Sequence, residues 1–357
     1  MQHSDIIGSF TRVGLAWSRD EHIRFASASG GAVTSILMYL LDYGLVDAVL
    51  VPRLRVRKGC AYGVYEAVFN SKDLPSFSGS VYAPVFFGNS LRSVLNRRLR
   101  VAIVAVPCIA RALRGLKSGS AVAASSIRYI FGLYCNNTPR LCASRFGIKH
   151  VFNVDPDDVV DVRFRGSGWP GFASIKTKSG QVFRALSPEF WDSGFGQYFY
   201  DRKCLCCSDQ TAEDADVSFA DPWTYTRGVG AGKTLVVVRT REGLEAIEGA
   251  RKAGYIEFEE LPSHIYAIQY TTLLKKVSKV TCKKYRQSYA LPPSISTIIH
   301  ELDYIVGSRL AKREELWPLL RLYIKLKYTL FRPLIALDYL LDLSFPRLLK
   351  KVSKAWK

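Results

Sequence analysis

Four cysteines in three separated segments are the residues of this chain most capable of chemistry. Cys108 follows a Val-Pro pair, Cys135 closes the run Gly-Leu-Tyr-Cys, and Cys204 and Cys207 form a Cys-x-x-Cys pair. Four thiolates that converge complete the coordination of a [4Fe–4S] cluster. Four thiolates also suit a structural zinc ion, and a lone Cys-x-x-Cys is equally typical of a redox disulfide. The residues therefore predict a thiolate site whose contents the spacing leaves open.

Two of these cysteines follow predicted strands in consecutive strand–helix units. The apolar run 100–106 predicts a buried strand ending just before Cys108, with a short helix over 110–116, and the run 127–134 predicts a strand ending at Cys135. Strands that alternate with helices predict an α/β sheet with some parallel pairing. Functional loops in such sheets lie beyond the carboxyl ends of the strands. We therefore expect Cys108 and Cys135 at one edge of a sheet.

A glycine-containing segment opens the first predicted helix, which covers residues 30–41. Ser29 is the expected cap of this helix, and Gly30 and Gly31 would present unpaired backbone N–H groups to whatever lies in front of it. Thr34 belongs to the same block. The alternative is an ordinary capped helix without a ligand. The pattern predicts further elements along the chain: strands at 47–51, 60–70, 234–240 and near 255, helices at 91–100 and 242–253, and a hairpin within 162–180.

Two glycine motifs resemble nucleotide-binding loops without meeting their requirements. The run 228–234, which contains Gly-Lys-Thr, has Arg227 where a phosphate loop needs its first glycine, and it precedes a predicted strand instead of a helix. The run 166–171 matches Gly-x-Gly-x-x-Gly, but Pro170 and the absence of a following helix pattern argue against a dinucleotide turn. A tight loop beside a ligand is the better interpretation of this second run, which includes Gly168.

Composition limits the class of protein. The 357 residues carry a net charge of +19, which attracts anionic cofactors, lipid headgroups or acidic partners, and no nucleic-acid-binding motif accompanies it. No apolar run predicts a spanning helix, and no secretory signal is evident, so we expect a cytoplasmic protein. Structural disulfides are rare there, and Cys60, Cys142 and Cys282 are expected to be plain thiols.

The ordered blocks of the chain resemble the coenzyme F420 hydrogenase/dehydrogenase beta-subunit family over roughly residues 20–260. The blocks are Ser29-Gly-Gly-Ala-Val-Thr, Val106-Pro-Cys-Ile-Ala, Gly132-Leu-Tyr-Cys, Phe164-Arg-Gly-Ser-Gly-Trp-Pro-Gly, the Cys-x-x-Cys pair with Asp209, Ala215-Asp-Val-Ser-Phe-Ala-Asp-Pro-Trp and Val238-Arg-Thr. The resemblance implies a flavin–iron–sulfur fold that binds FAD and one [4Fe–4S] cluster. Family members pass electrons between a deazaflavin, or another organic substrate, and a partner.

The resemblance also implies roles for individual residues. The cluster ligands would be Cys108, Cys135, Cys204 and Cys207, although the position of Cys206 directly before Cys207 also allows ligation through Cys206. The cofactor-binding residues would be Ser29, Gly30, Gly31, Thr34, Gly168 and Asp221. Ala220 replaces the glycine of the family's Gly-Asp-x-Trp element, which limits how closely a ligand can approach there. The chain lacks the Cys-x-x-Cys-x-x-Cys run of an added ferredoxin module, so it would hold one cluster at most.

The C-terminal segment differs from the rest of the chain. Residues 309–357 carry twelve Lys and Arg against four Asp and Glu, and the runs 317–328 and 334–341 predict amphipathic helices. Such helices dock on a membrane surface or a partner subunit, or pack on the body of the protein with a solvated basic face. We therefore expect a main domain over 1–300, in parts 1–150 and 151–300, and a helical tail over 301–357.

The sequence thus predicts an α/β protein with a mixed sheet, helices on its faces and a C-terminal amphipathic helical tail. Its expected function is that of a flavin–iron–sulfur oxidoreductase subunit. It would take a hydride from reduced coenzyme F420 or a similar donor and pass electrons to a partner redox subunit or a ferredoxin. A cytoplasmic location, with peripheral contact to a membrane through the tail, accompanies this hypothesis. The alternatives are a reductase of a pigment-like substrate, a cluster-binding relay subunit without flavin, and a zinc-stabilised binding protein.

Overall fold

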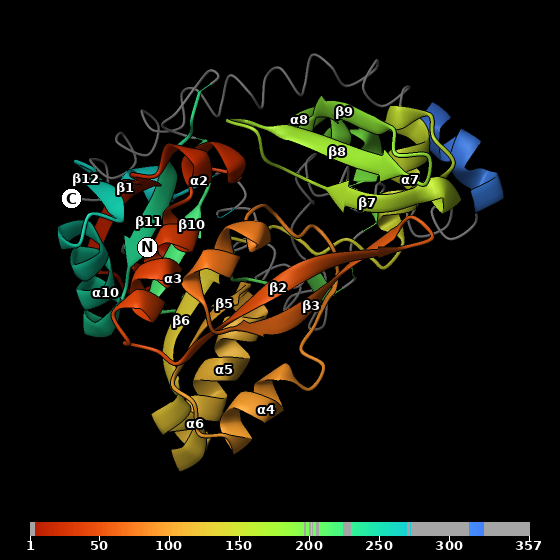
Figure 1. Ribbon diagram of the computed structural model, residues 1–357. Coiled ribbons are helices and arrows are strands. Elements are labelled where there is room, and N and C mark those ends of the chain that lie inside the picture. The colour runs from red at the N-terminus through yellow and green to blue at the C-terminus, as the bar shows by residue number, and fades with distance from the viewer. Residues whose placement is uncertain are drawn as a thin grey trace, which may run out of the picture. The chain divides into compact units, whose positions relative to one another are not determined.

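The computed structural model describes residues 4–195, 198–199, 201, 203–204, 207–223, 230–269, 272 and 314–324. The chain divides into two compact units, the first made of residues 1–196 and 200–289 and the second of 197–199 and 290–357. The first unit contains both sheets of the described structure (Figure 1). The predicted boundary at residue 150 stays a prediction, although the larger sheet draws strands from both sides of it.

A nine-stranded mixed sheet forms the centre of the first unit, with the strand order β12-β1-β11-β10-β6-β5-β2-β3-β4 (Figure 1). Four neighbouring pairs are parallel, namely β2–β5, β5–β6, β6–β10 and β3–β4, and the others are antiparallel. The strands are β1 (Arg12–Ser18), β2 (Ala48–Arg57), β3 (Cys60–Val68), β4 (Val85–Phe86), β5 (Val101–Ala105), β6 (Ile127–Leu133), β10 (Val217–Ala220), β11 (Thr234–Val238) and β12 (Ile256–Glu260). The predicted mixed α/β fold is confirmed.

Helices cover both faces of this sheet because its central strands are apolar on both sides. Val49 and Val51 of β2 pack in one hydrophobic cluster, whereas Ala48 and Leu50 pack in the other. The first cluster is closed by α3 and α10, and the second by α4, α5 and α6 (Figure 1). Among the residues described, the α-helices of the first unit are α1 (Ser4–Ile7), α2 (Glu21–Ala26), α3 (Ala32–Asp42), α4 (Ser90–Asn96), α5 (Pro107–Gly119), α6 (Ala121–Ser126), α7 (Ala143–Gly147), α8 (Ser187–Phe190) and α10 (Arg241–Lys252).

A second, three-stranded antiparallel sheet has the order β7-β8-β9. Its strands are β7 (Val159–Arg163), β8 (Phe172–Thr177) and β9 (Val182–Leu186). The predicted hairpin is therefore present as β7 and β8, with an added third strand. The glycine loop 166–171 connects β7 to β8, and no helix follows it, as the sequence predicts.

Some local predictions were wrong. Ser29 does not cap α3, because Gly31 occupies the N-cap position with a left-handed backbone (φ 74°) that favours glycine. Helix α5 begins at Pro107 and runs for 13 residues, so Cys108 lies inside its first turn instead of before it. Strand β1 and strand β10 were not predicted at all.

The prediction that Cys60 and Cys142 are plain thiols was also wrong, because the two residues form a disulfide across 82 residues of sequence. Hydrogen bonds bring the turn between β2 and β3 against the start of α7. The hydroxyl of Ser144 donates to the Gly59 carbonyl (2.6 Å) and accepts from the Ala61 N–H (2.8 Å). This long-range contact, which local patterns do not contain, places the two cysteines together.

The second unit is described over 198–199 and 314–324. Residues 317–324 are helical, which agrees with the start of the first predicted tail helix. Trp317 and Tyr323 of this helix contact Phe199 and Tyr198 through their rings, at centroid distances of 6.3 and 6.1 Å. The remainder of the predicted tail, including the run 334–341, lies outside the described residues. Within the described part of the chain, no helix has the length and apolar character needed to cross a membrane.

The disulfide should contribute to stability through the long loop that it closes. Replacing both cysteines with serine (C60S/C142S) is expected to lower the free energy of unfolding by about 2–4 kcal/mol, because the unfolded chain regains conformational freedom. Denaturant unfolding of the variant and of the parent chain, with and without reductant, measures this effect. Equal stability of parent and variant without reductant would contradict the expectation.

Candidate functional site

The direction of the strands brings several chemically distinct segments to one edge of the large sheet. Strands β10, β6 and β5 are mutually parallel neighbours, so their carboxyl ends lie together. Strand β1 runs in the same direction as β10, because both are antiparallel to β11 between them. Segments that follow β1, β5, β6 and β10 therefore emerge at this carboxyl edge. They carry, respectively, the glycine block before α3, Cys108, Cys135 and Asp221.

Cys108 and Cys135 leave the sheet from neighbouring strands. Ala105 at the end of β5 pairs with Gly132 near the end of β6, so the two cysteines follow adjacent strand ends, as the sequence predicts. The side chain of Cys108 is exposed in the first turn of α5. Burial raises the pKa of Tyr65, and negative charge at Cys108 acts in the same direction.

Main-chain hydrogen bonds connect Cys135 to the segment that carries the other two cysteines. The Cys135 N–H donates to the Gln210 carbonyl (2.9 Å), and the Thr138 N–H donates to Cys204 Sγ (3.4 Å). The N–H of Cys207 donates to the Cys204 carbonyl (3.3 Å). The loop after β6 and the Cys-x-x-Cys segment therefore lie against each other.

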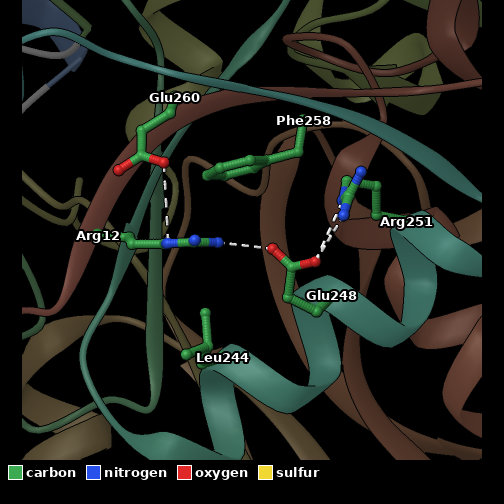
Figure 2. Close-up of a pocket in the computed structure, with 6 residues that line it drawn as sticks. All are labelled: Arg12, Leu244, Glu248, Arg251, Phe258 and Glu260. Atoms are coloured by element: carbon green, nitrogen blue, oxygen red, sulfur yellow. Dashed lines mark hydrogen bonds and ion pairs between the residues drawn. The ribbon is translucent and has the colours of Figure 1, made fainter.

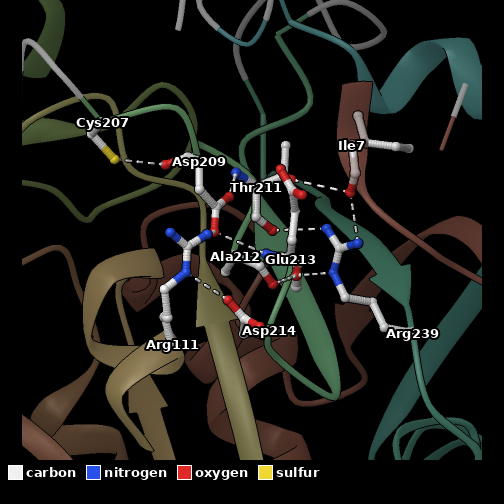
Figure 3. A network of polar contacts seen from close by, with 10 residues as sticks. Ile7, Arg111, Cys207, Asp209, Thr211, Ala212, Glu213, Asp214 and Arg239 are labelled. Atoms are coloured by element: carbon white, nitrogen blue, oxygen red, sulfur yellow. Dashed lines mark hydrogen bonds and ion pairs between the residues drawn. The ribbon is translucent and has the colours of Figure 1, made fainter. Parts of the chain in front are cut away.

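Asp209 fixes the turn that follows Cys207 (Figure 3). One carboxylate oxygen accepts from the Thr211 N–H (2.9 Å) and the other from the Glu213 N–H (3.2 Å), while Cys207 Sγ donates to the Asp209 carbonyl (3.2 Å). Arg111 of α5 approaches the same carboxylate at 3.8 Å. Because Arg111 lies one turn after Cys108, this contact connects the helix that carries Cys108 to the loop that carries Cys207.

A buried arginine supports this loop from the other side (Figure 3). Arg239 donates to the carbonyls of Ile7 (2.7 Å), Ser9 (3.0 Å) and Thr211 (2.9 Å) and to the hydroxyl of Ser218 (2.7 Å). Burial lowers its pKa, and nearby acidic groups including Asp209 oppose that shift. The guanidinium satisfies carbonyl oxygens that have no partner in a sheet or helix, and so holds an irregular segment in one conformation.

Gly132 of β6 lets the segment between Gln210 and β10 pass closely over the sheet. After Gln210 at the carboxyl edge, the chain returns over β6 to begin β10 at its amino end. A Cβ atom at Gly132 would lie 2.4 Å from the Cβ of Ala212 and 2.8 Å from that of Ala215. The glycine of the Gly-Leu-Tyr-Cys run therefore permits a close approach of two backbones, three residues before Cys135.

The four predicted ligands have the residue type that a thiolate-bound cluster needs, but they are not arranged as a closed metal site. Cys108, Cys135, Cys204 and Cys207 carry reduced thiols, whereas the other described cysteines form the disulfide. Across the residues that the structure describes, no group of three or more His, Cys, Asp or Glu side chains is arranged to hold a metal ion. Cys206 lies outside the described residues, so the alternative ligation through it stays a prediction.

The glycine block after β1 packs against a second glycine segment. Gly30 and Gly31 both have positive φ angles, of 98° and 74°, and a Cβ at Gly30 would lie 2.9 Å from Lys233 Cα. The Thr234 hydroxyl donates to the Ser29 carbonyl, and the Ser18 N–H donates to the Gly30 carbonyl (2.8 Å). The Gly-Lys-Thr run thus supports the glycine block and precedes β11, so it is no phosphate loop.

The loop 166–171 lies beside the same block. The Gly168 N–H donates to the Phe25 carbonyl (2.8 Å), and Trp169 forms an isolated antiparallel bridge with Gly230. Arg165, at the start of this loop, forms an ion pair with Asp221 just after β10. The structure therefore brings together all the predicted cofactor-binding segments, which are those of Ser29, Gly30, Gly31 and Thr34, of Gly168 and of Asp221.

A hollow of about 370 Å³ lies elsewhere, at the amino end of β1 (Figure 2). Glu248 lies between Arg12 (2.6 Å) and Arg251 (2.8 Å), and Arg12 also approaches Glu260 (3.8 Å). The hydrogen bond from Arg251 lowers the pKa of Glu248, with Arg12 acting in the same direction and burial against it. These charges neutralise one another at the edge opposite the glycine block, so the hollow is not part of the candidate site.

Sequence reasoning missed the residues that hold the site together. Arg165, Arg239 and Arg111 were not singled out, because no local pattern separates an arginine that makes long-range contacts from one that makes none. Arg165 does lie within the Phe164-Arg-Gly block and Arg239 within the Val238-Arg-Thr block, which were the available signals. Thr138 and Gln210 contribute main-chain hydrogen bonds, which the identity of their side chains does not predict.

Comparison with known proteins identifies the family. Residues 13–92 match the model described as coenzyme F420 hydrogenase/dehydrogenase, beta subunit N-term, and residues 99–264 match the model for the C terminus of the same beta subunit. The chain belongs to this family. The predicted resemblance is thereby confirmed, and the family's members named below are oxidoreductase subunits.

Several relatives are subunits of F420-linked enzymes. The F420-dependent formate dehydrogenase subunit beta of Methanocaldococcus jannaschii is 29% identical over 276 residues, which cover 77% of this chain and 68% of the relative. The F420-dependent formate dehydrogenase 1 subunit beta of Methanococcus maripaludis is 32% identical, over 64% of this chain and 56% of the relative. The coenzyme F420 hydrogenase subunit beta of Methanothermobacter thermautotrophicus is 26% identical, over 71% and 85%.

A solved structure has a similar fold. A chain of the F420-reducing [NiFe] hydrogenase complex from Methanosarcina barkeri superposes with a TM-score of 0.63 at 17% identity, covering 82% of this chain and 97% of that chain. At this level of identity the likeness concerns the fold alone. It agrees with the mixed α/β architecture described above.

The role of Gly132 can be tested with a matched glycine. G132A is expected to cost about 1–3 kcal/mol of folding free energy, because the added methyl group collides with Ala212 and Ala215. G115A, within α5, meets no atom within 4 Å and is expected to stabilise the chain by up to about 1 kcal/mol. Thermal unfolding of both variants measures the difference. The same sign of change in both variants would refute the steric explanation.

Proposed function

We propose that this chain is a flavin–iron–sulfur subunit that takes a hydride from reduced coenzyme F420 and passes the electrons to a partner redox subunit. The observation that supports this proposal is the common carboxyl edge of the sheet, from which the segments with Cys108, Cys135 and the glycine block emerge and against which the Cys-x-x-Cys segment is hydrogen-bonded. The names of the relatives support F420 as the substrate, since they are F420-dependent enzymes. FAD and a [4Fe–4S] cluster would supply the conversion of a two-electron hydride into single-electron transfers.

The cluster would be held by Cys108, Cys135, Cys204 and Cys207. The Thr138 N–H, which donates to Cys204 Sγ at 3.4 Å, would stabilise negative charge on that sulfur. Hydrogen bonds to cluster sulfurs are one of the means by which a protein tunes the reduction potential. Asp209 and Arg239 hold the loop beyond Cys207, so the thiolate would keep its position while the charge of the cluster changes.

FAD would lie along the glycine block and the loop 166–171. Within the described part of the chain, the N–H groups of Gly31 and Thr34 and of the two residues between them have no hydrogen-bond acceptor. They belong to the first turn of α3, where the helix dipole also favours an anion such as a diphosphate. Gly168 and Asp221 would border the same cofactor from the other two segments.

The overall charge suits the proposed substrate. A net charge of +19 favours approach of an anionic molecule, and coenzyme F420 carries a phosphate and a glutamate tail. The partner would be a separate redox subunit, because the chain supplies the thiols for one cluster only. Peripheral contact of the basic C-terminal tail with that partner, or with a membrane surface, stays a prediction.

Anaerobic purification of the chain tests the proposal most directly. We expect about four irons and one FAD per chain, with a broad absorption shoulder near 400 nm beneath the flavin bands. Reduced F420 should then bleach the flavin under anaerobic conditions. A colourless protein that contains zinc would refute the cluster, and iron without flavin would identify a relay subunit instead.

Single substitutions of the ligands provide a sharper test. Changing Cys108, Cys135, Cys204 or Cys207 to serine is expected to remove most of the iron, because each variant leaves an incomplete set of thiolates. The double variant C60S/C142S is the matched control, since it removes two cysteines that are joined to each other in a disulfide and should retain about four irons. Iron and acid-labile sulfide assays report the outcome.

Cys206 distinguishes the two modes of ligation. If Cys207 is the ligand, C206S should keep its iron and its absorption spectrum, whereas C207S should lose both. The reverse result would assign the ligand to Cys206 and leave the remainder of the proposal intact.

A further inference from the structure

Arg165 contacts the main chain of both glycine segments of the candidate site. Its Nη2 donates to the Ala28 carbonyl (2.9 Å), immediately before Ser29, and its Nε donates to the Pro170 carbonyl (3.2 Å), within the loop 166–171. The residue is 3% exposed. A single side chain therefore joins two distant segments of the chain. Ala28 lies 137 residues before Arg165 in the sequence.

The third nitrogen of Arg165 connects these segments to β10. Its Nη1 donates to the carboxylate of Asp221 and to the hydroxyl of Tyr82 (3.3 Å). Burial acts to lower the pKa of Arg165, but the Asp221 carboxylate and Tyr82 outweigh it and raise the pKa above its ordinary value. The guanidinium is therefore charged at every working pH, and it is paired as a buried charge must be.

Two indole rings, which also contact each other, pack beside the guanidinium. Its central carbon lies 5.2 Å from the ring centroid of Trp169 and 5.8 Å from that of Trp223, and the two rings lie 4.5 Å apart. Trp169 is buried, whereas Trp223 is 49% exposed. The position of Arg165 is thus fixed by packing as well as by hydrogen bonds, so it can serve as a reference point for the two glycine segments.

The contact with Ala28 also determines which way the next amide points. The peptide between Ala28 and Ser29 is trans, and in a trans peptide the carbonyl and the N–H point in opposite directions. Because the Ala28 carbonyl faces Arg165, the Ser29 N–H faces away from it. No hydrogen bond in the described part of the chain uses this N–H.

We propose that Arg165 is the positioning residue of the FAD site, which sets the Ser29–Gly31 and Gly166–Gly171 segments against Asp221. This inference rests on the proposed function, because it assigns no new ligand. Lysine cannot replace Arg165 here. An ammonium has one nitrogen, whereas the structure uses all three nitrogens of a planar guanidinium.

The test compares R165K with R114K. Arg114 also donates to a main-chain carbonyl, that of Asp214 (2.9 Å), and to a buried carboxylate, that of Asp216 (2.7 Å), but at the amino end of β10. FAD affinity is measured by titrating the flavin-free chain, and visible circular dichroism of the flavin is recorded at saturation. R165K should bind FAD about ten- to a hundredfold more weakly and with an altered dichroism, because hydrogen bonds of a charged group are lost. R114K should match the parent chain in both measurements.

The outcomes separate the inference from the function on which it rests. Parental FAD affinity in R165K, or an equal loss in R114K, would overturn the positioning role while the proposed function stands. A parent chain that binds no FAD would overturn both. Chemical rescue adds a readout that general destabilisation does not affect. Ethylguanidinium at millimolar concentration should restore FAD binding to R165A, and ethylammonium should not. Equal effects of the two ions would count against the inference.

Discussion

The parallel pairing of β5, β6 and β10 is the constraint on which the rest of the structure depends. Backbone hydrogen bonds between these strands fix their direction and register, so that Ala105 of β5 is opposite Gly132 of β6, and Leu133 opposite Phe219 of β10. The segments that follow each strand must then begin at a common edge. Because β1 runs in the same direction, the glycine block reaches that edge as well. Segments from four distant parts of the sequence therefore begin at that edge.

Irregular segments at such an edge leave main-chain carbonyls outside any helix or ladder, and buried arginines satisfy them. Arg239 collects three carbonyls on the side of the cysteine loop, and Arg165 collects two on the side of the glycine segments. An unpaired buried carbonyl costs free energy comparable to a lost hydrogen bond, so each guanidinium compensates several such losses at once. The two arginines differ in how their buried positive charges are compensated. Arg165 is paired with Asp221 and its pKa is raised, whereas burial lowers the pKa of Arg239.

An element could be predicted from the sequence where local residues determine it, and it was missed where contacts with distant residues determine it. Strands β5 and β6 were predicted because short, mainly apolar runs of about five to eight residues are typical of buried parallel strands. Strand β10 was missed because its four residues include Ser218, whose hydroxyl is satisfied by Ala212 and Arg239, contacts that no local pattern contains. Strand β1 was missed for a similar reason. Its partners β11 and β12 lie more than 200 residues away, at Val238 and Glu260.

The candidate site shows the same division between local and long-range information. The thiols and glycines were proposed from the sequence because their chemistry resides in the residue type itself. The disulfide between Cys60 and Cys142 and the contacts of Arg165 were not found, because they depend on which segments the fold brings together. Strand β10 illustrates why these contacts matter. It has only four residues, yet Arg239 binds the segment before it and Arg165 binds Asp221 after it. The two buried guanidiniums thereby fix both ends of the strand that lies between the cysteine loop and the glycine segments, so the spacing of the two proposed redox centres depends on them.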